Sequence, residues 1–175
     1  MKKGERGLTL LELLIALAVV GLLMGIATPA VDRWVQETRA TTGTNMMIGS
    51  LQFARSESLR VGVPVSLCPS RDGRHCAADQ QAWSEGWLIY RHQQSHGNNR
   101  LSHPDQILRV QSAGVPGLRA NRQRFTMRTD GRRSTNGSIL VCREGEALAA
   151  RAIIINVNGR ARSTRDPQRM PSPEC

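Results

Sequence analysis

The sequence predicts an α+β protein, in which one long N-terminal helix precedes a compact head built on an antiparallel β-sheet. Three patterns lead to this prediction. Residues 13–31 form an apolar run without a charged side chain. A three-to-four-residue apolar spacing, typical of an amphipathic helix, continues from there to about residue 61. After residue 62, short β-prone runs alternate with turn residues, as expected for an antiparallel sheet.

The first part of the helix is long enough to cross a bilayer. Residues 8–31 would span ~36 Å as a helix, and Lys2, Lys3 and Arg6 precede them. Because positive charge marks the cytoplasmic side, we expect a single pass through the inner membrane with the head in the periplasm. A cleaved secretory signal is the alternative, since residues 25–27 resemble a small-residue cleavage site. The apolar run is longer than an ordinary signal core and continues into further helix, which favours the membrane anchor.

Glu12 lies inside this apolar segment. An isolated carboxylate in the membrane costs ~2.5 to 3.5 kcal/mol. We therefore expect this side chain to have both a partner and a function.

Beyond Pro29, an amphipathic half of the same helix is predicted over residues 32–61. It should end near Gly62 and Pro64, because glycine and proline terminate helices. Its apolar and small residues recur at helical spacing and are expected to face the head. They are Val31, Trp34, Val35, Thr38, Met46, Met47, Leu51, Ala54, Ser58 and Leu59.

Residues 62–175 are predicted to form one globular head of ordinary domain size, which is too short for a two-domain enzyme. Alternation predicts strands near 63–68, 86–91, 107–111, 123–129, 138–143 and 151–157, with a hairpin return at 160–164.

All four cysteines follow the apolar segment, which indicates disulfides formed in an oxidising compartment. We expect a Cys68–Cys76 bridge that closes a loop containing an Asp-Gly turn. A Cys142–Cys175 bridge would hold the proline-rich C-terminal tail. Four cysteines allow three pairings, so the others stay open. Zinc is the alternative, with His75 beside Cys76, but no cysteine pair has the usual zinc-ligand spacing, and we expect no metal or cofactor.

The chain is strongly basic, with a formal net charge of +10. Summed positive charge attracts anionic partners, so a basic head outside the cytoplasm suggests nucleic acid or lipid headgroups. Charge alone does not choose between them.

Two arginines stand at the end of the predicted last hairpin. An apolar strand from Ile153 runs into Asn158-Gly159, which predicts a type I′ turn, and Arg160 and Arg162 follow on the return strand. Strand alternation places both on one face with Ala161 opposite, about 6 to 7 Å apart. This arrangement suits neighbouring phosphates of a nucleic acid.

A second group of arginines surrounds the strand predicted at 123–129. Phe125 and Met127 should face the core, while Arg122, Arg124 and Arg128 share the outer face. Other arginines that would extend this patch are Arg119, Arg132, Arg133 and Arg165. The alternative interpretation of both groups is a solvated surface without a ligand.

No catalytic constellation is evident, so we do not expect an enzyme. The four histidines, His75, His92, His96 and His103, lie in turn-rich stretches without a nucleophile or phosphate-loop motif. Aromatic residues make up only 3% of the chain, too few for a base-stacking row. Nucleic-acid contact is therefore expected to involve the backbone of double-stranded DNA, with little dependence on sequence.

The segment Gly7-Leu8-Thr-Leu-Leu-Glu12 resembles the processing motif of type IV prepilins and type II secretion pseudopilins. The resemblance implies a leader at 1–7, cleavage between Gly7 and Leu8 by an inner-membrane prepilin peptidase, and N-methylation of Leu8. It also implies that Glu12 functions in filament assembly, where an amine at Leu8 could neutralise it. Leu8 replaces the commoner Phe, and Pro29 stands where such pilins have a helix-bending proline.

Three further segments resemble the GspH/FimT group of minor pilins: Cys68-Pro-Ser-x-Asp-Gly-x-x-Cys76, residues 83–90, and the late Asn-Gly-Arg. The chain is most similar to the FimT type. That resemblance implies a minor pilin that assembles with other pilins and captures extracellular DNA during natural transformation, with Gly159-Arg160-x-Arg162 as the DNA-binding motif. A FimU-like structural pilin that primes or caps the pilus is one alternative, and a GspH-like secretion pseudopilin is another.

Processing can be tested directly on the membrane-extracted protein. Mass spectrometry should detect a chain that begins at N-methylated Leu8, and replacing Gly7 with a bulky residue should leave the full-length precursor. A mature N-terminus near Thr28 would instead indicate cleavage by a signal peptidase.

Overall fold

The computed structural model describes residues 9–92, 104–112, 115–130, 134–142, 149–166, 168 and 175, with the backbone alone at 26–30 and at 149. Several predicted features lie outside the described residues: the leader, the cleavage and methylation site at Gly7 and Leu8, His96, His103, Arg132 and Arg133. Contacts divide the chain into two units, Met1–Thr38 and Arg39–Cys175. Each unit is described by itself.

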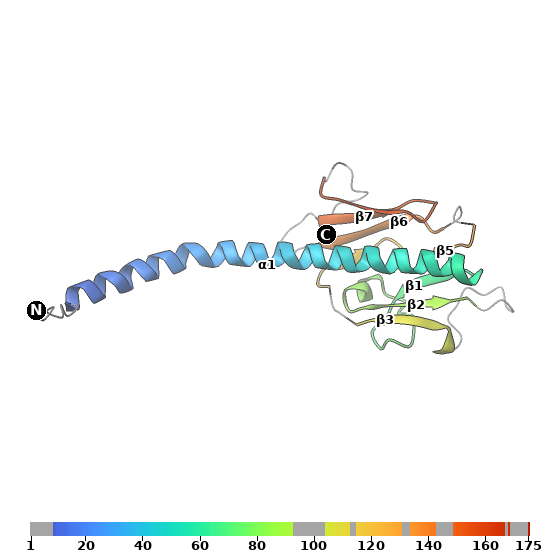
Figure 1. Cartoon of the computed structure of the whole chain (residues 1–175), viewed down its shortest axis with the longest axis horizontal. Helices are drawn as coiled ribbons and strands as arrows, with labels where there is room; N and C mark the ends of the chain where they lie inside the picture. The colour runs from blue at the N-terminus through green and yellow to red at the C-terminus, as the bar shows by residue number, and fades with distance from the viewer. Residues whose placement is uncertain are drawn as a thin grey trace, which may run out of the picture. The chain divides into compact units, whose positions relative to one another are not determined.

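Helix α1, Leu10–Val61, is the only α-helix of the described residues (Figure 1). The helix ends at Gly62, as predicted. Gly62 adopts a φ of 69°, and its N–H donates to the Ser58 carbonyl at 3.1 Å. In the first unit most of the described apolar side chains of α1 are exposed, including Leu10 at 78% and Trp34 at 70%. Within the part of the chain that the structure describes, no helical stretch is both long and apolar enough to cross a membrane.

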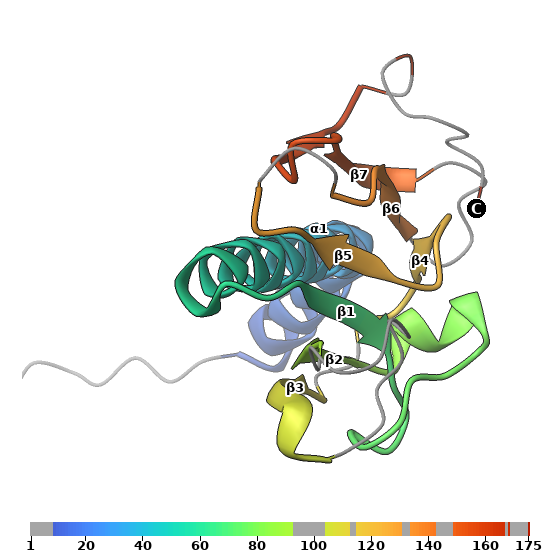
Figure 2. The same ribbon diagram turned by 90° about the vertical axis from the view of Figure 1, so that its right-hand side faces the viewer.

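The strands of the second unit form two four-stranded antiparallel sheets. The first has the order β3-β2-β1-β5 and comprises β1 (Val65–Pro69), β2 (Trp87–Arg91), β3 (Ile107–Gln111) and β5 (Phe125–Met127). The second has the order β4-β6-β7-β8 and comprises β4 (Leu118–Ala120), β6 (Gly137–Cys142), β7 (Ala149–Ile155) and β8 (Ala161–Thr164). Figure 2 shows β5 beside β1, with β6 and β7 on the other side of β5. Two short 3-10 helices, η1 (Gln80–Ser84) and η2 (Pro104–Gln106), precede β2 and β3.

One apolar core joins both sheets to the second half of α1. Strand alternation explains its composition, because partners such as Leu67, Ile89 and Phe125 are opposite one another and turn to the same face. Burial of each such large side chain contributes about 1.5 to 3 kcal/mol. The fully or nearly fully buried members include Ala40, Met47, Leu51, Ala54, Val65, Leu67, Trp83, Trp87, Ile89, Leu118, Phe125, Met127, Ile139, Val141, Ile153 and Ile155.

Polar side chains on the buried face of α1 are hydrogen-bonded. Ser50 Oγ accepts the indole N–H of Trp87 at 2.9 Å and donates to the Met46 carbonyl at 3.0 Å. Thr44 Oγ1 donates to the Ala40 carbonyl at 2.7 Å. These bonds allow the helix to bury small polar residues without leaving unsatisfied groups, which would each cost about 1 to 3 kcal/mol.

At Gly43, α1 lies close to the loop before β4. A Cβ atom placed there would overlap the side chain of Val115, which is 5% exposed. Gly49, six residues later on the same helix, faces open space. The two helical glycines therefore differ in role, because only Gly43 is required by packing.

The α+β class and the antiparallel pairing are confirmed. The expectation of one sheet is wrong, since the strands divide between two, and the predicted strand at 123–129 is only three residues long. The sequence does not predict β4, a three-residue strand with Arg119 at its centre. In the predicted helical stripe, Met47, Leu51, Ala54 and Ser58 are buried, but Val31, Trp34 and Leu59 are exposed.

The two helical glycines offer a matched test of packing. Gly43→Ala should lower the free energy of unfolding of the full chain by about 1 kcal/mol, because overpacking outweighs the gain in helix propensity. Gly49→Ala should raise it by roughly 0.5 to 1 kcal/mol. Urea unfolding measures both, and equal effects of the two substitutions would contradict the close contact with Val115.

Candidate nucleic-acid interface

The hairpin of β7 and β8 carries the two arginines that the sequence singles out. Ile155 pairs with Ala161 and Ile154 pairs with Arg162, so β8 is the edge strand of the second sheet. Ile153 and Ile155 are buried, and Ala161 packs against the same core. The hairpin is therefore attached to the head by its apolar face. On the opposite face Arg162 is exposed, while Ala152 is buried beside the Cys142–Cys175 bridge.

Residues 156–160 connect the two strands, and Asn156 and Arg160 close a three-residue loop between them. The Gly159 N–H donates to the Asn156 carbonyl at 2.9 Å, and the Asn156 N–H donates to the Arg160 carbonyl at 3.1 Å. Gly159 has a φ of 68°, a conformation that favours glycine. The predicted two-residue type I′ turn is thus wrong: the loop is Val157, Asn158 and Gly159, the usual arrangement of a turn followed by a left-handed glycine.

Asn156 stabilises this loop with its side chain. Its Oδ1 accepts the backbone N–H of Asn158 at 3.1 Å and that of Arg160 at 2.9 Å. Asparagine side chains commonly imitate a backbone turn in this way. The backbone that carries Arg160 is consequently fixed by side-chain and main-chain bonds together.

Arg160 and Arg162 are both exposed, and Ala161 between them is partly buried. Among the described residues, no carboxylate lies within ion-pair distance of either guanidinium. Both cations therefore face solvent, Arg162 from the edge strand β8 and Arg160 from the loop that precedes it.

Ser134 links the hairpin loop to β5 of the other sheet. Its N–H donates to the Val157 carbonyl at 3.0 Å, and its Oγ accepts the N–H of Arg128 at 3.3 Å. A Cβ atom on Gly159 would come within 2.9 Å of Ser134 Oγ and 3.0 Å of Met127 Sδ. The structure thus brings exposed Arg128 to the same end of the head as the hairpin loop, although the two belong to different sheets.

Arg122 and Arg124 do not share one outer face with Arg128 along a strand, because β5 begins only at Phe125. The Arg122 carbonyl accepts the indole N–H of Trp83 at 3.1 Å, which fixes this loop to η1. Arg124 is only partly exposed, and its Cζ lies 6.0 Å from the centre of the Tyr90 ring on β2. Arg119 donates to the backbone oxygen of Cys175.

At the other end of the chain, Glu12 caps the start of α1. Its Oε2 accepts the Thr9 N–H and the Thr9 hydroxyl, both at 3.0 Å, while Thr9 Oγ1 accepts the Glu12 N–H at 3.3 Å. This reciprocal arrangement is a capping box, which satisfies backbone donors at a helix start. The Glu12 carboxylate therefore has a hydrogen-bond partner, Thr9, at the start of its own helix.

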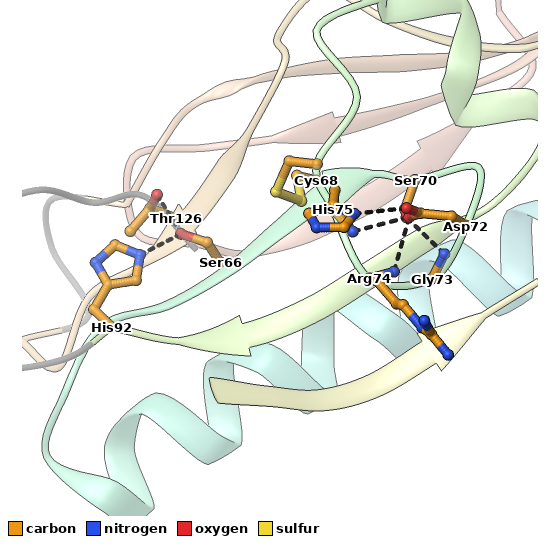
Figure 3. The surroundings of a disulfide bond; sticks show 10 residues. Ser66, Cys68, Ser70, Asp72, Gly73, Arg74, His75, His92 and Thr126 are labelled. Carbon is orange, nitrogen blue, oxygen red and sulfur yellow. Dashed lines mark hydrogen bonds and ion pairs between the residues drawn. A yellow bond between two sulfur atoms is a disulfide. The ribbon is translucent and has the colours of Figure 1, made fainter. Parts of the chain in front are cut away.

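The structure contains two disulfides, Cys68–Cys76 and Cys142–Cys175, which is the pairing that the sequence predicts. Within the first loop, Asp72 Oδ1 accepts the N–H groups of Arg74 and His75 at 2.9 Å, and Oδ2 contacts His75 Nδ1 at 2.6 Å (Figure 3). The imidazole of His75 above all, and then the backbone donors, hold the pKa of the Asp72 carboxyl well below its usual range. The Asp72 carboxylate is thus hydrogen-bonded within the loop itself, which lies over the outer face of the first sheet.

A buried polar cluster lies beside that disulfide. Ser66 Oγ is 2.7 Å from His92 Nε2 and 2.7 Å from Thr126 Oγ1 (Figure 3). A serine next to a histidine is the geometry of an activated nucleophile, but Ser66 is fully buried and His92 is 8% exposed. This burial favours a structural role for the pair. No group of three or more metal-ligating side chains is present in the described part of the chain.

Comparison with known families agrees with this architecture. The model for type II transport protein GspH matches residues 44–159, well over half of the chain. The chain belongs to the GspH family. A second model, the prokaryotic N-terminal methylation motif, matches residues 2–28. This member of the GspH family is accordingly a pilin-like protein of the minor pilin and pseudopilin class.

Individual relatives cover parts of the GspH-family chain. The type IV major fimbrial protein FimA of Dichelobacter nodosus is 34% identical over 62 residues, which are 35% of this chain and 38% of that protein. The chain thus spans 38% of the length of the curated relatives it matches. The crystal structure of the type IV minor pilin FimU of Pseudomonas aeruginosa has a TM-score of 0.51 at 18% identity, covering 76% of this chain and 98% of that one. At that identity the likeness shows the shared fold.

The sequence misses the residues that position the arginines. Ser134 lies in a short segment between strands and has no pattern of its own. Asn156 could have been recognised, because Asn-x-Asn-Gly after an apolar strand indicates a side-chain-supported turn. The proximity of Arg128 to the hairpin has no signal in the sequence, since it depends on packing between two sheets.

The capped loop around Asp72 predicts a pH dependence. A depressed pKa in the folded state means that the carboxylate stabilises the fold above its unfolded pKa of ~3.9, and that this contribution is lost as the pH falls further. The difference in Tm between the wild type and Asp72→Asn should therefore be largest near neutral pH and shrink between about pH 4 and pH 2. Asp32→Asn removes the same charge from exposed helix and is the control. A difference that stays constant with pH would contradict the assignment.

Proposed function

We propose that this GspH-family protein is a minor type IV pilin that captures extracellular double-stranded DNA through arginines of its head. The observation that carries the proposal is the β7–β8 edge, where Arg162 on β8 and Arg160 in the loop just before it are both exposed. Guanidinium groups bind phosphate oxygens with paired hydrogen bonds, so two exposed arginines two residues apart suit a phosphate backbone.

Arg128 supports the same site from the neighbouring sheet. Its backbone is tied through Ser134 to the Val157 carbonyl at the hairpin loop. Three exposed cations would then act at one end of the head, and each phosphate neutralised releases counterions from the DNA. Arg122 and Arg124 are secondary members of the proposed site, because the Arg122 backbone is held at η1 and the Arg124 guanidinium lies near the Tyr90 ring.

Contact through phosphates fits the burial of the aromatic side chains. Trp83, Trp87, Tyr90 and Phe125 are all fully buried in the head. Base stacking on aromatic rings is the usual way to bind single strands without sequence preference. With these rings inside the core, the head is suited to the duplex backbone.

The N-terminal motif completes the proposal. The leader at 1–7 would be removed between Gly7 and Leu8 by a prepilin peptidase, Leu8 methylated, and residues 8–31 would anchor the protein in the inner membrane before assembly with other pilins. The match to the methylation motif supports this course. In the filament, Glu12 would exchange its Thr9 partner for a terminal amine, which keeps the carboxylate paired.

A structural role is the second candidate. The likeness to FimU in fold and the family match to GspH favour a pilin that primes or caps a filament, or a pseudopilin of a secretion system. Such a protein would need the core and the helix but not the exposed arginines. DNA binding therefore separates the two candidates.

A paired substitution tests the site. Arg160→Gln with Arg162→Gln should weaken binding to duplex DNA strongly and lower the slope of log affinity against log salt by roughly 2, about 0.9 per phosphate contact. Because exposed arginines contribute little to folding, the Tm should change by only a few degrees. Transformation should fall while pilus assembly persists.

Arg91→Gln with Arg109→Gln is the matched control, since it removes the same charge from exposed strand positions of the first sheet. The control should keep most of the affinity. If the hairpin variant binds like the wild type across the salt titration, the hairpin is not the site. If the wild type binds no DNA even at low salt, the structural candidate replaces the proposal.

A further inference from the structure

The hairpin that carries the arginines has an uncharged tip. Val157 is 53% exposed, and in the described part of the second unit only Leu59 and Val110 are other large hydrophobic residues with exposed side chains. Asn158 beside it is exposed, and no described residue bonds its side-chain amide. An apolar side chain and a free amide therefore project together where the backbone reverses.

The tip is held rigid although its side chains are exposed. The Val157 carbonyl accepts the Ser134 N–H at 3.0 Å, and the Asn158 N–H donates to Asn156 Oδ1 at 3.1 Å. Gly159 packs against Ser134 and Met127 so closely that no side chain fits there. Since these bonds are already made in the free protein, little conformational entropy is lost when the tip binds.

We propose that Val157 and Asn158 enter the minor groove of the duplex whose phosphates Arg160 and Arg162 contact. This inference rests on the proposed function and adds a binding mode to it. Proteins that enter the minor groove use apolar wedges together with Asn and Arg, which are the residue types gathered here. The exposed amide would meet the acceptors on the groove floor, and the arginines would meet the phosphates at its rim.

The shape of the hairpin favours the minor groove over the major groove. The major groove, about 12 Å wide, admits a complete two-stranded ribbon. Here β7 is paired with β6 and the strands are part of a sheet, so only the three-residue loop projects. Two neighbouring side chains at the tip of one loop suit the narrower groove, about 6 Å wide.

The minor groove distinguishes A·T from G·C pairs and little else, because only G·C pairs place an amino group on its floor. Binding is therefore expected to prefer A·T-rich duplexes modestly, and the preference should depend on Asn158. Contacts made by uncharged side chains release no counterions, so their loss should not change the salt dependence.

The test uses the full-length protein in detergent and fluorescently labelled duplexes of about 30 base pairs, either A·T-rich or G·C-rich. Val157→Ala with Asn158→Ala should reduce affinity for the A·T-rich duplex roughly fivefold or more and abolish the A·T preference, with the salt slope unchanged. Netropsin, which occupies the minor groove, should displace the wild type, whereas methyl green in the major groove should not. Val157→Leu keeps an apolar wedge and should retain binding, and Val110→Ala is the matched control on β3.

The outcomes separate the two proposals. Insertion into the minor groove is wrong if the tip variant keeps the affinity and the A·T preference of the wild type. It is also wrong if methyl green displaces the protein while netropsin does not. Neither result contradicts the proposed phosphate contacts of the arginines. If the tip variant lowers the slope of log affinity against log salt as the arginine variant does, the tip does not act as an uncharged contact. The inference then also fails. If the wild type binds neither duplex, the proposed function itself fails.

Discussion

The head depends on the packing of one helix face against two sheets at once. The second half of α1 contributes Ala40, Met47, Leu51 and Ala54 to a core that also contains inward residues of both sheets. Because the sheets share no ladder, the helix is the common surface on which both bury their apolar faces. This explains the small residues on α1: Gly43 lets Val115 approach, and Ser50 receives the Trp87 indole.

A second connection between the sheets determines the geometry of the candidate interface. Ser134 bonds the hairpin loop through its N–H and Arg128 through its Oγ. The next residue, Thr135, donates its N–H to the Thr126 carbonyl at 2.9 Å and accepts the Thr126 N–H at its Oγ1 at 3.2 Å. The segment 134–135 thus extends the edge of β5 toward the β7–β8 loop. Backbone bonds, and not ion pairs, position the exposed cations.

The acidic groups of the described chain are mostly used locally, which leaves the arginine excess unneutralised. Glu57 pairs with Arg60 at 2.6 Å, and Arg71 bridges Asp79 and Glu85 at 3.1 and 2.8 Å. Asp72 is satisfied within the Cys68–Cys76 loop, and Glu12 caps its own helix. Exposed pairs of this kind add little stability. These carboxylates are thus engaged by partners other than Arg160 and Arg162.

The sequence by itself determined the class of fold and most of its elements. Apolar periodicity predicted α1 to its end at Gly62, alternation predicted seven of the strands, and the cysteine positions suggested the two bridges, because these signals are local in the chain. The sequence also predicted that Arg160 and Arg162 are exposed, since the alternation around Ala161 is a local pattern. Only the tertiary structure decided that the strands form two sheets, that the hairpin loop has three residues, and that Arg128 joins the hairpin while Arg124 lies over Tyr90. Those features depend on contacts between segments far apart in sequence, such as Ser134 with Val157 and Gly43 with Val115, and no local pattern specifies such contacts.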